Sequence, residues 1–401
     1  GRMGATLYSN GDNNAPRRPH YEHRPRAKLG ALRAQPGPLL SKKPGYVELS
    51  HAKGYRFCRS DLLVGAQLGG AVTGAHKPRT IQAAHAQLRA NSVGLNQMED
   101  LAIVVLCYNS RAHLPRCLLS LSAAIRGLAA KVFLVDNAST DGTAHYVRRE
   151  FPWCDLIRND RNSGYASGNN LGLKAAGFPK APRFRHAMLL NPDTELPADA
   201  LRAMLAYLEN HTDIGVLGPK LVLADGSLDK ACKRGLPTPG TAILHFSGLA
   251  RLFPRSPLFG RYNMTFVGAD EIADVDSTVG ACQLMRGGAL AKVGLLDEDF
   301  FMYGEDLDLN LRMRRTGYRV VYYPRVAVKH LKGTSTRKEP ERMINAFYDS
   351  MKIFHRKHFA HEHSAPFNRL VYAVVDLICR YKLIHNRFKP PARRVVGSAP
   401  E

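Results

Sequence analysis

Two apolar runs, LAIVVL at residues 101–106 and KVFLV at residues 131–135, decide the fold class of this chain. Both are short and rich in β-branched residues, which is typical of strands that are buried on both faces of a sheet. Between them, residues 114–128 carry apolar side chains at the spacing of a helix. Strands that alternate with helices favour a parallel sheet with helices on its faces. The sequence therefore predicts an α/β fold.

The same alternation continues along the chain. Residues 143–150 and 201–209 have helical periodicity, and the apolar runs at residues 187–190 and 318–323 are typical of further strands. In open α/β sheets, ligands bind beyond the carboxyl ends of the strands. The polar motifs described below fall at these ends.

The composition excludes a disordered or membrane-spanning class for the chain as a whole. Of its 401 residues, 45% are hydrophobic and 23% are charged, the ordinary balance of a soluble globular protein. No stretch approaches the roughly 20 apolar residues of a membrane span. The net charge is +23, and an excess of this size attracts nucleic acid, anionic lipid or an anionic substrate without choosing between them.

The first 97 residues differ from the rest of the chain. They hold 15 Lys and Arg against four Asp and Glu, are rich in Pro, Gly and His, and have weak hydrophobic periodicity. We therefore predict a basic, disordered extension over residues 1–97 and a folded α/β domain over residues 98–360. Met98 precedes the first strand as a start codon would, so the extension is either an appendage or upstream sequence read as protein. The alternative is that residues 62–72 dock on the domain.

The last part of the chain, residues 361–401, is predicted to form a basic amphipathic helix and a tail. Residues 367–388 mix apolar side chains with Arg and Lys. Such a helix lies on an anionic membrane surface or packs on the domain, and both interpretations stay open.

The cysteines predict the cellular location. All seven are scattered, and no CxxC or metal-ligand spacing occurs, so we expect neither a disulfide framework nor a zinc site. The first residues also lack an apolar signal core. We expect a cytoplasmic protein, with peripheral contact at the inner face of the plasma membrane.

Two polar motifs follow the first strands. After the second strand comes Asp136-Asn-Ala-Ser-Thr-Asp-Gly142, in which Asp136 can accept hydrogen bonds from a base or ribose while Ser139 and Asp141 cap the next helix. The alternative is a turn and cap alone. Residues 162–170, NSGYASGNN, then open a helix whose glycines let the backbone approach a ligand and whose N-terminus favours negative charge.

Two further motifs contain candidate metal ligands. Asp193 lies in Asn-Pro-Asp-Thr-Glu at the end of a predicted strand, where a divalent cation would bridge it to a diphosphate, because Mg²⁺ takes carboxylate and phosphate oxygens. His330 lies in VKHLKGTST, and a neutral imidazole is a good ligand for ions such as Mn²⁺. Taken singly, the first motif also reads as a strand-ending turn and the second as an ordinary histidine.

The last motif is FFMYGEDLDL at residues 300–309. Its carboxylates, Glu305 and Asp306, follow an aromatic and glycine-bearing loop at the start of an apolar-periodic helix. One of them can act as a general base on an acceptor hydroxyl. Acidic residues also stabilise helix N-termini for purely structural reasons, so the motif alone leaves both interpretations open.

Together these motifs resemble the ordered series of the family 2 glycosyltransferases, in particular the bacterial rhamnosyltransferase-like branch. The resemblance covers residues 101–359 and includes VVLCYN at residues 104–109 and an Arg at residue 312. It implies a GT-A fold, which is a Rossmann-like mixed sheet flanked by helices, and a donor activated as a nucleoside diphosphate.

The resemblance also implies a role for individual residues. Asp306, beside Glu305, resembles the catalytic base of the family, and Asp193 and His330 resemble its metal or diphosphate contacts, with Mg²⁺ or Mn²⁺ as the cofactor. One departure is that the first acid of the DxD motif is here an amide, Asn191. The residues expected to contact the donor are Tyr108, Asn109, Asp136, Asn137, Ser139, Asp141, Asn162, Gly164, Tyr165, Gly168, Asn169, Asn191 and Arg286.

The implied function is inverting transfer of a sugar from a nucleoside-diphosphate sugar to a hydroxyl of a glycan or lipid-linked acceptor. The branch suggests thymidine-diphosphate rhamnose as donor and cell-surface polysaccharide synthesis as the process. A nucleotidyl transferase would need a glycine- and lysine-rich loop after the first strand, which residues 107–110 lack. A basic nucleic-acid-binding protein without catalysis remains the alternative, supported by arginines such as Arg17 and Arg24, although it leaves the carboxylate motifs unexplained.

Overall fold

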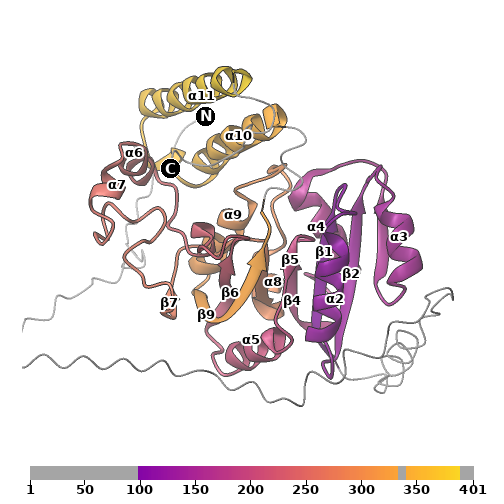
Figure 1. Ribbon diagram of the computed structural model, residues 1–401. Helices are drawn as coiled ribbons and strands as arrows, with labels where there is room; N and C mark the ends of the chain where they lie inside the picture. Colours follow the sequence, from indigo (N-terminus) through magenta and orange to yellow (C-terminus); the bar gives the residue numbers. More distant parts are fainter. Residues whose placement is uncertain (1–97, 333–339, 389–401) are drawn as a thin grey trace, which may run out of the picture. The chain divides into compact units, whose positions relative to one another are not determined.

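The computed structural model describes residues 98–332 and 340–388 (Figure 1). Within them the strands form one nine-stranded sheet of order β3-β2-β1-β4-β8-β6-β9-β5, with β7 paired to β9. The predicted extension over residues 1–97, including residues 62–72, lies outside the described part. The strands are β1 Glu99–Cys107, β2 Ala130–Asn137, β3 Asp155–Asn159, β4 Phe184–Leu190, β5 Thr194–Glu195, β6 Ile214–Val222, β7 Ala273–Asp274, β8 Cys282–Arg286 and β9 Arg319–His330.

The two apolar runs of the sequence form adjacent parallel strands. β1 pairs with β2 on one side and with β4 on the other, both in parallel, so it lies inside the sheet. Its residues Leu101 to Val105 are fully buried because neighbouring strands cover both edges and helices cover both faces. The later half is mixed, since β8 runs antiparallel to both β4 and β6. The predicted α/β fold class, a Rossmann-like mixed sheet flanked by helices, is confirmed.

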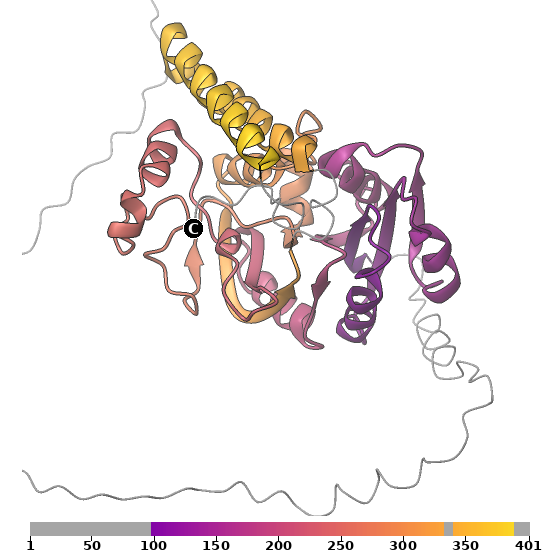
Figure 2. The same ribbon diagram turned by 45° about the horizontal axis from the view of Figure 1, so that its top comes forward.

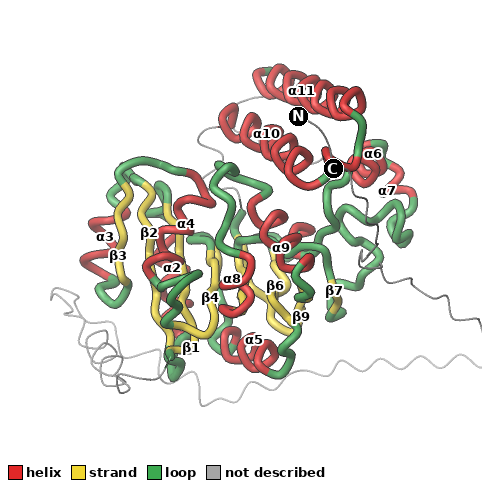
Figure 3. The backbone as a smooth tube through the Cα atoms, turned by 180° about the vertical axis from the view of Figure 1, so that it is seen from behind, coloured by secondary structure: helices red, strands yellow, loops and turns green. Residues whose placement is uncertain are grey.

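Helices lie on both faces of this sheet (Figures 1 and 3). Short 3-10 turns occur at Lys230–Cys232 and Ala360–Glu362. The helices are α2 Leu114–Ala124, α3 Thr143–Glu150, α4 Gly164–Ala175, α5 Ala200–Glu209, α6 Pro239–Phe246, α7 Leu249–Leu252, α8 Gly287–Val293, α9 Glu305–Arg315, α10 Pro340–His358 and α11 Ala365–Arg387.

Helix α4 lies very close to the sheet because two of its residues are glycines. A Cβ atom on Gly168 would lie 2.6 Å from the Leu106 side chain, and one on Gly172 would lie 2.5 Å from Val104. These positions therefore serve helix–sheet packing. Gly168, which we expected to let a ligand approach, is thus also required for packing against β1, and its contact with a ligand stays a prediction.

The C-terminal helices extend the domain beyond its main core. A small apolar cluster of Phe300, Leu311 and Phe354 joins α9 to α10, and α11 packs on α10. The six cysteines in the described part of the chain are free. Among residues 98–332 and 340–388, no helix combines the length and apolar character needed to cross a membrane.

Candidate active site

The carboxyl ends of β1, β2 and β4 lie side by side. The strand register pairs Cys107 with Asp136, and Val105 with Leu190. The polar turns that follow these three strands therefore share one edge of the sheet. The motifs predicted from the sequence begin at this edge.

The turns after β1 and β2 are tied together by hydrogen bonds. The Ser139 hydroxyl accepts from the Asn109 backbone N–H at 2.9 Å, and the Asn109 side-chain carbonyl accepts from the Thr140 N–H at 2.8 Å. Asp141 accepts from the N–H groups of Arg111 and Thr143 at 2.9 and 3.1 Å. The structure thus brings together Asn109, Ser139 and Asp141, three of the residues expected to contact the nucleotide-sugar donor. Their hydrogen bonds also stabilise the turns.

Asp136 and Tyr108 line the same turns. Asp136 is buried at the end of β2, where it accepts a hydrogen bond from the Ser139 N–H at 3.3 Å. Tyr108 follows β1 and is half-buried. Asp136 therefore lies at the position from which a strand-end carboxylate would recognise a base or ribose.

The next group of residues predicted to contact the nucleotide-sugar donor holds α4 in place. The Asn137 amide donates to Asn162 at 3.0 Å and to the Gly164 carbonyl at 3.1 Å, and its oxygen accepts from Asn159 at 2.8 Å. Asn169 donates to the Tyr165 carbonyl at 2.9 Å. Asn137 and Asn169 are buried, so these amides act by positioning the helix that faces the site.

The start of α4 is also bonded to the loop that precedes α9. The Tyr165 N–H donates to the Phe301 carbonyl at 2.6 Å, and its phenol donates to the Gly280 carbonyl at 2.8 Å. Gly164 has a φ of 88°, and a Cβ there would lie 2.3 Å from the Phe301 oxygen. Only glycine fits this close approach. Tyr165 is thereby fixed between the loop before α9 and the segment before β8.

The first acidic group surrounds His330. β5 pairs with the end of β9, which places His330 Nε2 3.5 Å from Asp193 Oδ1. His330 Nδ1 lies 3.2 Å from Asp229 Oδ2, and Lys332 Nζ lies 2.8 Å from Asp229 Oδ1. Asn191 contributes its backbone, because its carbonyl accepts from the Thr194 hydroxyl at 2.7 Å.

Without a bound cation, electrostatics in this group favour a protonated His330 beside its two carboxylates, and a cation at Nε2 would displace that proton. Burial alone would lower the pKa of His330, but the hydrogen bonds to Asp193 and Asp229 outweigh it and raise this pKa to about 9. Burial would likewise raise the pKa of Asp229, but hydrogen bonds from His330 and Lys332 hold it well below its ordinary value. Asp229 thus fixes the orientation of the imidazole from the side opposite Asp193.

The geometry of Asp193 and His330 fits a cation that takes its other ligands from water and substrate phosphate. Asp193 Oδ1 and His330 Nε2 face each other closely enough to share one ion, and Asp229 on Nδ1 supplies the outer partner that metal-binding histidines need. In the described part of the chain no group of three or more His, Cys, Asp or Glu could hold a metal. The remaining ligands would therefore be water and phosphate oxygens, which suits Mg²⁺ or Mn²⁺.

The second acidic group lies at the start of α9. Gly304, with a φ of 84°, precedes the helix, and Tyr303 has a φ of 70°. Asp306 Oδ2 accepts from the Arg234 guanidinium at 2.6 Å and from the Gly280 N–H at 3.1 Å. The second carboxyl, Glu305, is buried, and its Oε2 has no hydrogen-bond partner among the described residues.

The two neighbouring carboxyl groups therefore differ in their environments. Burial, and then the charge of Asp306, raise the pKa of Glu305 to about 8. Burial also raises the pKa of Tyr165 well above its ordinary value, and the carboxylates of Glu305, Asp306 and Asp193 raise it further. Backbone bonds bring the two acidic groups to one site, because the Gly280 N–H donates to Asp306 and the next carbonyl, that of Ala281, accepts from the Asn191 N–H at 2.8 Å, two residues before Asp193.

Arg286 does not belong to this edge. β8 is antiparallel to β4, and its register pairs Cys282 with Leu190 but Arg286 with His186, at the far end of β4. The Arg286 guanidinium donates to the backbone carbonyls of Ile214, Leu208 and His211 at 2.8, 2.5 and 2.9 Å. The expected donor contact is corrected, because these bonds join β8 to the turn after α5.

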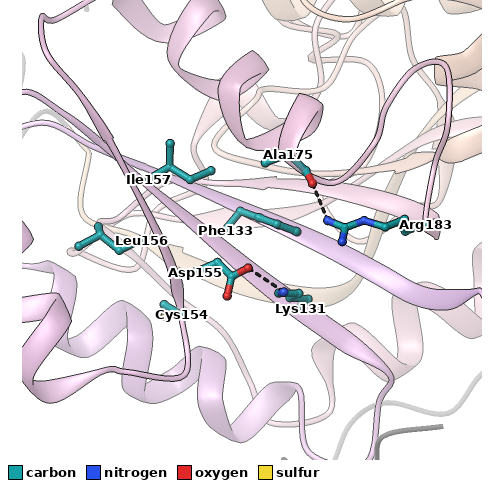
Figure 4. Close-up of a pocket in the computed structure, with 8 residues that line it drawn as sticks. All are labelled: Lys131, Phe133, Cys154, Asp155, Leu156, Ile157, Ala175 and Arg183. Carbon is teal, nitrogen blue, oxygen red and sulfur yellow. Dashed lines mark hydrogen bonds and ion pairs between the residues drawn. The ribbon is translucent and has the colours of Figure 1, made fainter. Parts of the chain in front are cut away.

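A separate depression also lies away from the site (Figure 4). It has a volume of about 480 Å³ and opens beside the amino ends of β2 and β3. An ion pair of 2.7 Å between Lys131 and Asp155 lines it, together with Phe133 and Arg183. None of the predicted site residues lines this depression.

Sequence reasoning missed two residues of the site, Arg234 and Asp229. Arg234 pairs with a residue 72 positions away, and Asp229 with one 101 positions away. Neither lies in a motif or directly after an apolar run. No local signal in the sequence could have identified them.

Comparison with known proteins agrees with the motif series. The model of the family described as "Glycosyltransferase like family 2" matches residues 99–347. N-acetylglucosaminyl-diphospho-decaprenol L-rhamnosyltransferase of Mycobacterium tuberculosis is 32% identical over 261 residues, which are 63% of this chain and 83% of that protein. Low-salt glycan biosynthesis hexosyltransferase Agl10 of Haloferax volcanii is 25% identical over 56% of this chain and 64% of that protein.

Among solved structures, S. aureus TarS 1-349 has a TM-score of 0.43 and 17% identity, and covers 68% of this chain and 69% of its own. The predicted resemblance, including its rhamnosyltransferase-like character, is confirmed by the family match and the mycobacterial relative. The chain belongs to the glycosyltransferase-like family 2.

Proposed function

We propose that this enzyme transfers a sugar, with inversion, from a nucleoside-diphosphate sugar to a hydroxyl of a lipid-linked glycan acceptor in cell-surface polysaccharide synthesis. The observation that carries the proposal is that Gly280 and Ala281 bond to both acidic segments. The Gly280 N–H donates to Asp306, beside Glu305, and the Ala281 carbonyl accepts from Asn191, close to Asp193 and His330. One group suits a diphosphate and its cation, and the other suits an attacking hydroxyl. The mycobacterial relative, named as a rhamnosyltransferase acting on a diphospho-decaprenol glycan, supports thymidine-diphosphate rhamnose as donor.

The donor is proposed to bind across the ends of β1 and β2. Asp136 accepts hydrogen bonds from the base or ribose, and the turns held by Asn109, Ser139 and Asp141 contact the nucleotide. Asn137, Asn162, Gly164 and Asn169 act indirectly, because their bonds position the start of α4.

The diphosphate is proposed to lie beside Asp193 and His330, which hold Mg²⁺ or Mn²⁺. A bound cation neutralises the charge that develops on the leaving diphosphate. Asp229 keeps Nδ1 of the imidazole occupied, so Nε2 is the nitrogen that faces Asp193. Lys332 adds a positive charge next to this pair.

Asp306 is proposed to accept the proton of the acceptor hydroxyl. As that oxygen bonds to the anomeric carbon, the bond to the diphosphate breaks on the opposite face, which inverts the configuration. Arg234 and the Gly280 N–H hold Asp306 from one side and so fix its direction. Glu305, whose pKa is about 8, is protonated near neutral pH and does not repel this carboxylate.

Incubation with thymidine-diphosphate rhamnose and a polyprenyl-diphosphate N-acetylglucosamine tests the proposal. We expect a disaccharide-lipid product whose anomeric configuration is opposite to that of the donor. Retention of configuration would exclude the single displacement, and absence of transfer across a panel of nucleotide sugars would exclude the donor class.

We place the enzyme in the cytoplasm, at the inner face of the plasma membrane where such an acceptor is presented.

A further inference from the structure

Helix α11 exposes a continuous apolar stripe. Its members recur at alternating spacings of three and four residues, so they lie along one face of the helix. Their exposed fractions run from 37% to 84%, which is high for large apolar side chains. They are Phe367, Leu370, Val374, Leu377, Tyr381, Ile384 and Phe388.

The opposite face of α11 is occupied by α10. Asp376 pairs with Lys352 at 2.7 Å, and Asn368 lies 2.8 Å from His355 Nε2. Cys379 bonds to Asn345 at 3.5 Å. The packing of the helix is therefore satisfied on its inner side, and the apolar stripe on its outer side is not part of that contact.

The charges on α11 are mainly positive. Arg369, Arg380 and Arg387 are exposed, although Arg387 pairs with Glu341 of α10 at 3.3 Å, and the one acidic residue of α11, the half-exposed Asp376, pairs with Lys352. A second copy of this helix would bring one net positive surface toward another, which disfavours self-association. The segment over residues 1–97, with 15 Lys and Arg against four Asp and Glu, is also of the wrong sign. An anionic partner is the complement of this face.

The α10–α11 pair is attached to residues 300–308, the segment that carries Asp306 and is named the catalytic loop here. The rings of Tyr303 and Phe347 are 5.6 Å apart, and His358 Nε2 lies 2.7 Å from Asp308 Oδ1. Figures 1 and 2 show α6 and α7 on the same side of the molecule as this pair. Ile243 of α6 and Leu252 of α7 add further exposed apolar side chains there.

We propose that the exposed face of α11 docks on an anionic lipid surface, with its apolar stripe among the headgroups and its arginines on the lipid phosphates. Amphipathic helices with arginine on the polar flank bind in this way, parallel to the membrane plane. The inference deepens the proposed function, on which it rests for its purpose, because a surface joined to the catalytic loop brings a lipid-linked acceptor to Asp306. Lipid binding itself needs no catalysis.

Flotation of the full-length chain with vesicles tests the proposal. We expect binding to an equal mixture of phosphatidylcholine and phosphatidylglycerol, weaker binding to phosphatidylcholine alone, and release by salt. Leu370→Gln, Leu377→Gln and Ile384→Gln together should reduce binding by about ten-fold or more. The matched control is Leu119→Gln on α2, which is 58% exposed and should bind like the wild type.

The arginines are tested separately. Arg369→Gln with Arg380→Gln should remove the preference for phosphatidylglycerol, whereas Arg148→Gln, an exposed arginine on α3, should not. Equal binding of the wild type and the triple glutamine variant would overturn the proposal. A wild type that sediments as a dimer, together with a triple variant that sediments as a monomer, would also overturn it. The stripe would then be a contact between two copies.

Activity assays separate this inference from the proposed function. The triple variant should keep normal transfer to a short-chain, water-soluble acceptor and lose transfer to the same glycan in vesicles. If the wild type binds vesicles but transfers to neither acceptor, the proposed function fails and the docking surface stands. If the variant transfers equally well to both, the docking inference fails and the function stands.

Discussion

At the scale of single residues, Glu305 and Asp306 are adjacent in sequence but have opposite environments. Asp306 receives hydrogen bonds from Arg234 and Gly280, and Glu305 is buried with one oxygen that has no partner in the described part of the chain. Pairs of carboxyl groups with different environments commonly divide the roles of a site between them. Here the geometry assigns the oriented carboxylate to Asp306.

Asp306→Asn should lower turnover by about 10²- to 10⁴-fold while nucleotide binding stays nearly unchanged, because an amide keeps the shape but cannot accept the proton. Turnover and calorimetric titration with the donor nucleotide measure the two effects. Circular dichroism is the control, since the change also leaves Arg234 without its charged partner. Near-normal turnover in a folded variant would exclude Asp306 as the base.

Glu305→Gln should change the pH dependence of stability. The pKa of Glu305 is raised to about 8 in the folded protein, so the folded state holds the proton more tightly than the unfolded state. Stability is therefore lost as the pH rises from the ordinary value of 4.5 toward 8. Glutamine removes this loss, so the thermal midpoint of the variant minus that of the wild type should increase by several degrees between about pH 5 and about pH 9. A constant difference across this range would contradict the assignment.

Asp229→Asn should weaken metal binding without removing a metal ligand. Loss of the carboxylate beside His330 Nδ1 leaves the imidazole less firmly oriented, and outer partners of this kind are worth about 10- to 100-fold in affinity. Titration with Mn²⁺, followed by electron paramagnetic resonance, measures the change directly. Asp193→Ala is the comparison and should lose diphosphate-nucleotide binding more than nucleoside binding. Equal Mn²⁺ affinity in the wild type and Asp229→Asn would show that Asp229 has no part in the site.

At the scale of elements, the close contact between α4 and the sheet determines where the site lies. Gly168 and Gly172 let the helix approach β1, and Gly164 lets its start meet the loop before α9. This packing fixes Tyr165 against the loop before α9 and the segment before β8. The glycines of the NSGYASGNN segment therefore set the position of α4.

Gly172→Ala should destabilise the enzyme by about 1–3 kcal/mol, because its Cβ would lie 2.5 Å from Val104 and overpack the contact between α4 and β1. Gly288→Ala on α8 is the matched control. A Cβ there meets nothing within 4 Å, so the better helix propensity of alanine should stabilise by up to about 1 kcal/mol. Urea unfolding of both variants measures these effects. Equal stability of the two would mean that α4 moves away from the sheet at little cost.

At the scale of the whole molecule, the described fold contains its own core and site. The central strand β1 begins at Glu99 and finds both neighbours, β2 and β4, within the described residues. The residues of both acidic groups lie between Asp193 and Lys332.

A chain that begins at Met98 should therefore keep the thermal midpoint and turnover of the full-length protein. Residues 1–97 have a composition with little apolar surface to offset the entropy of ordering them. Differential scanning calorimetry and a transfer assay on both chains make the comparison. A midpoint lower by several degrees, or the loss of most activity, would show that the segment belongs to the working structure.

The sequence by itself determined the strands β1, β2, β4 and β9, several of the helices between them, and the edge at which the motifs lie. Hydrophobic periodicity is local, so LAIVVL and KVFLV could be recognised as buried strands without any tertiary information. Parallel strands bring their carboxyl ends to one edge, so Asp136 and Asp193 were expected there and are found there. The α11 helix was predicted from the same local pattern.

Only the tertiary structure decided which partners these residues meet. Arg234 and Asp229 reach the site from loops 72 and 101 positions away from their partners, and such pairing leaves no periodic signal in the chain. Strand direction is also invisible locally, since an apolar run reads alike in both senses, and the reversal of β8 moved Arg286 to the far end of the sheet. From the sequence, Gly168 could allow either a ligand or a neighbouring element to come close, because a residue without a Cβ suits any close neighbour. Only the folded chain shows that this neighbour is Leu106.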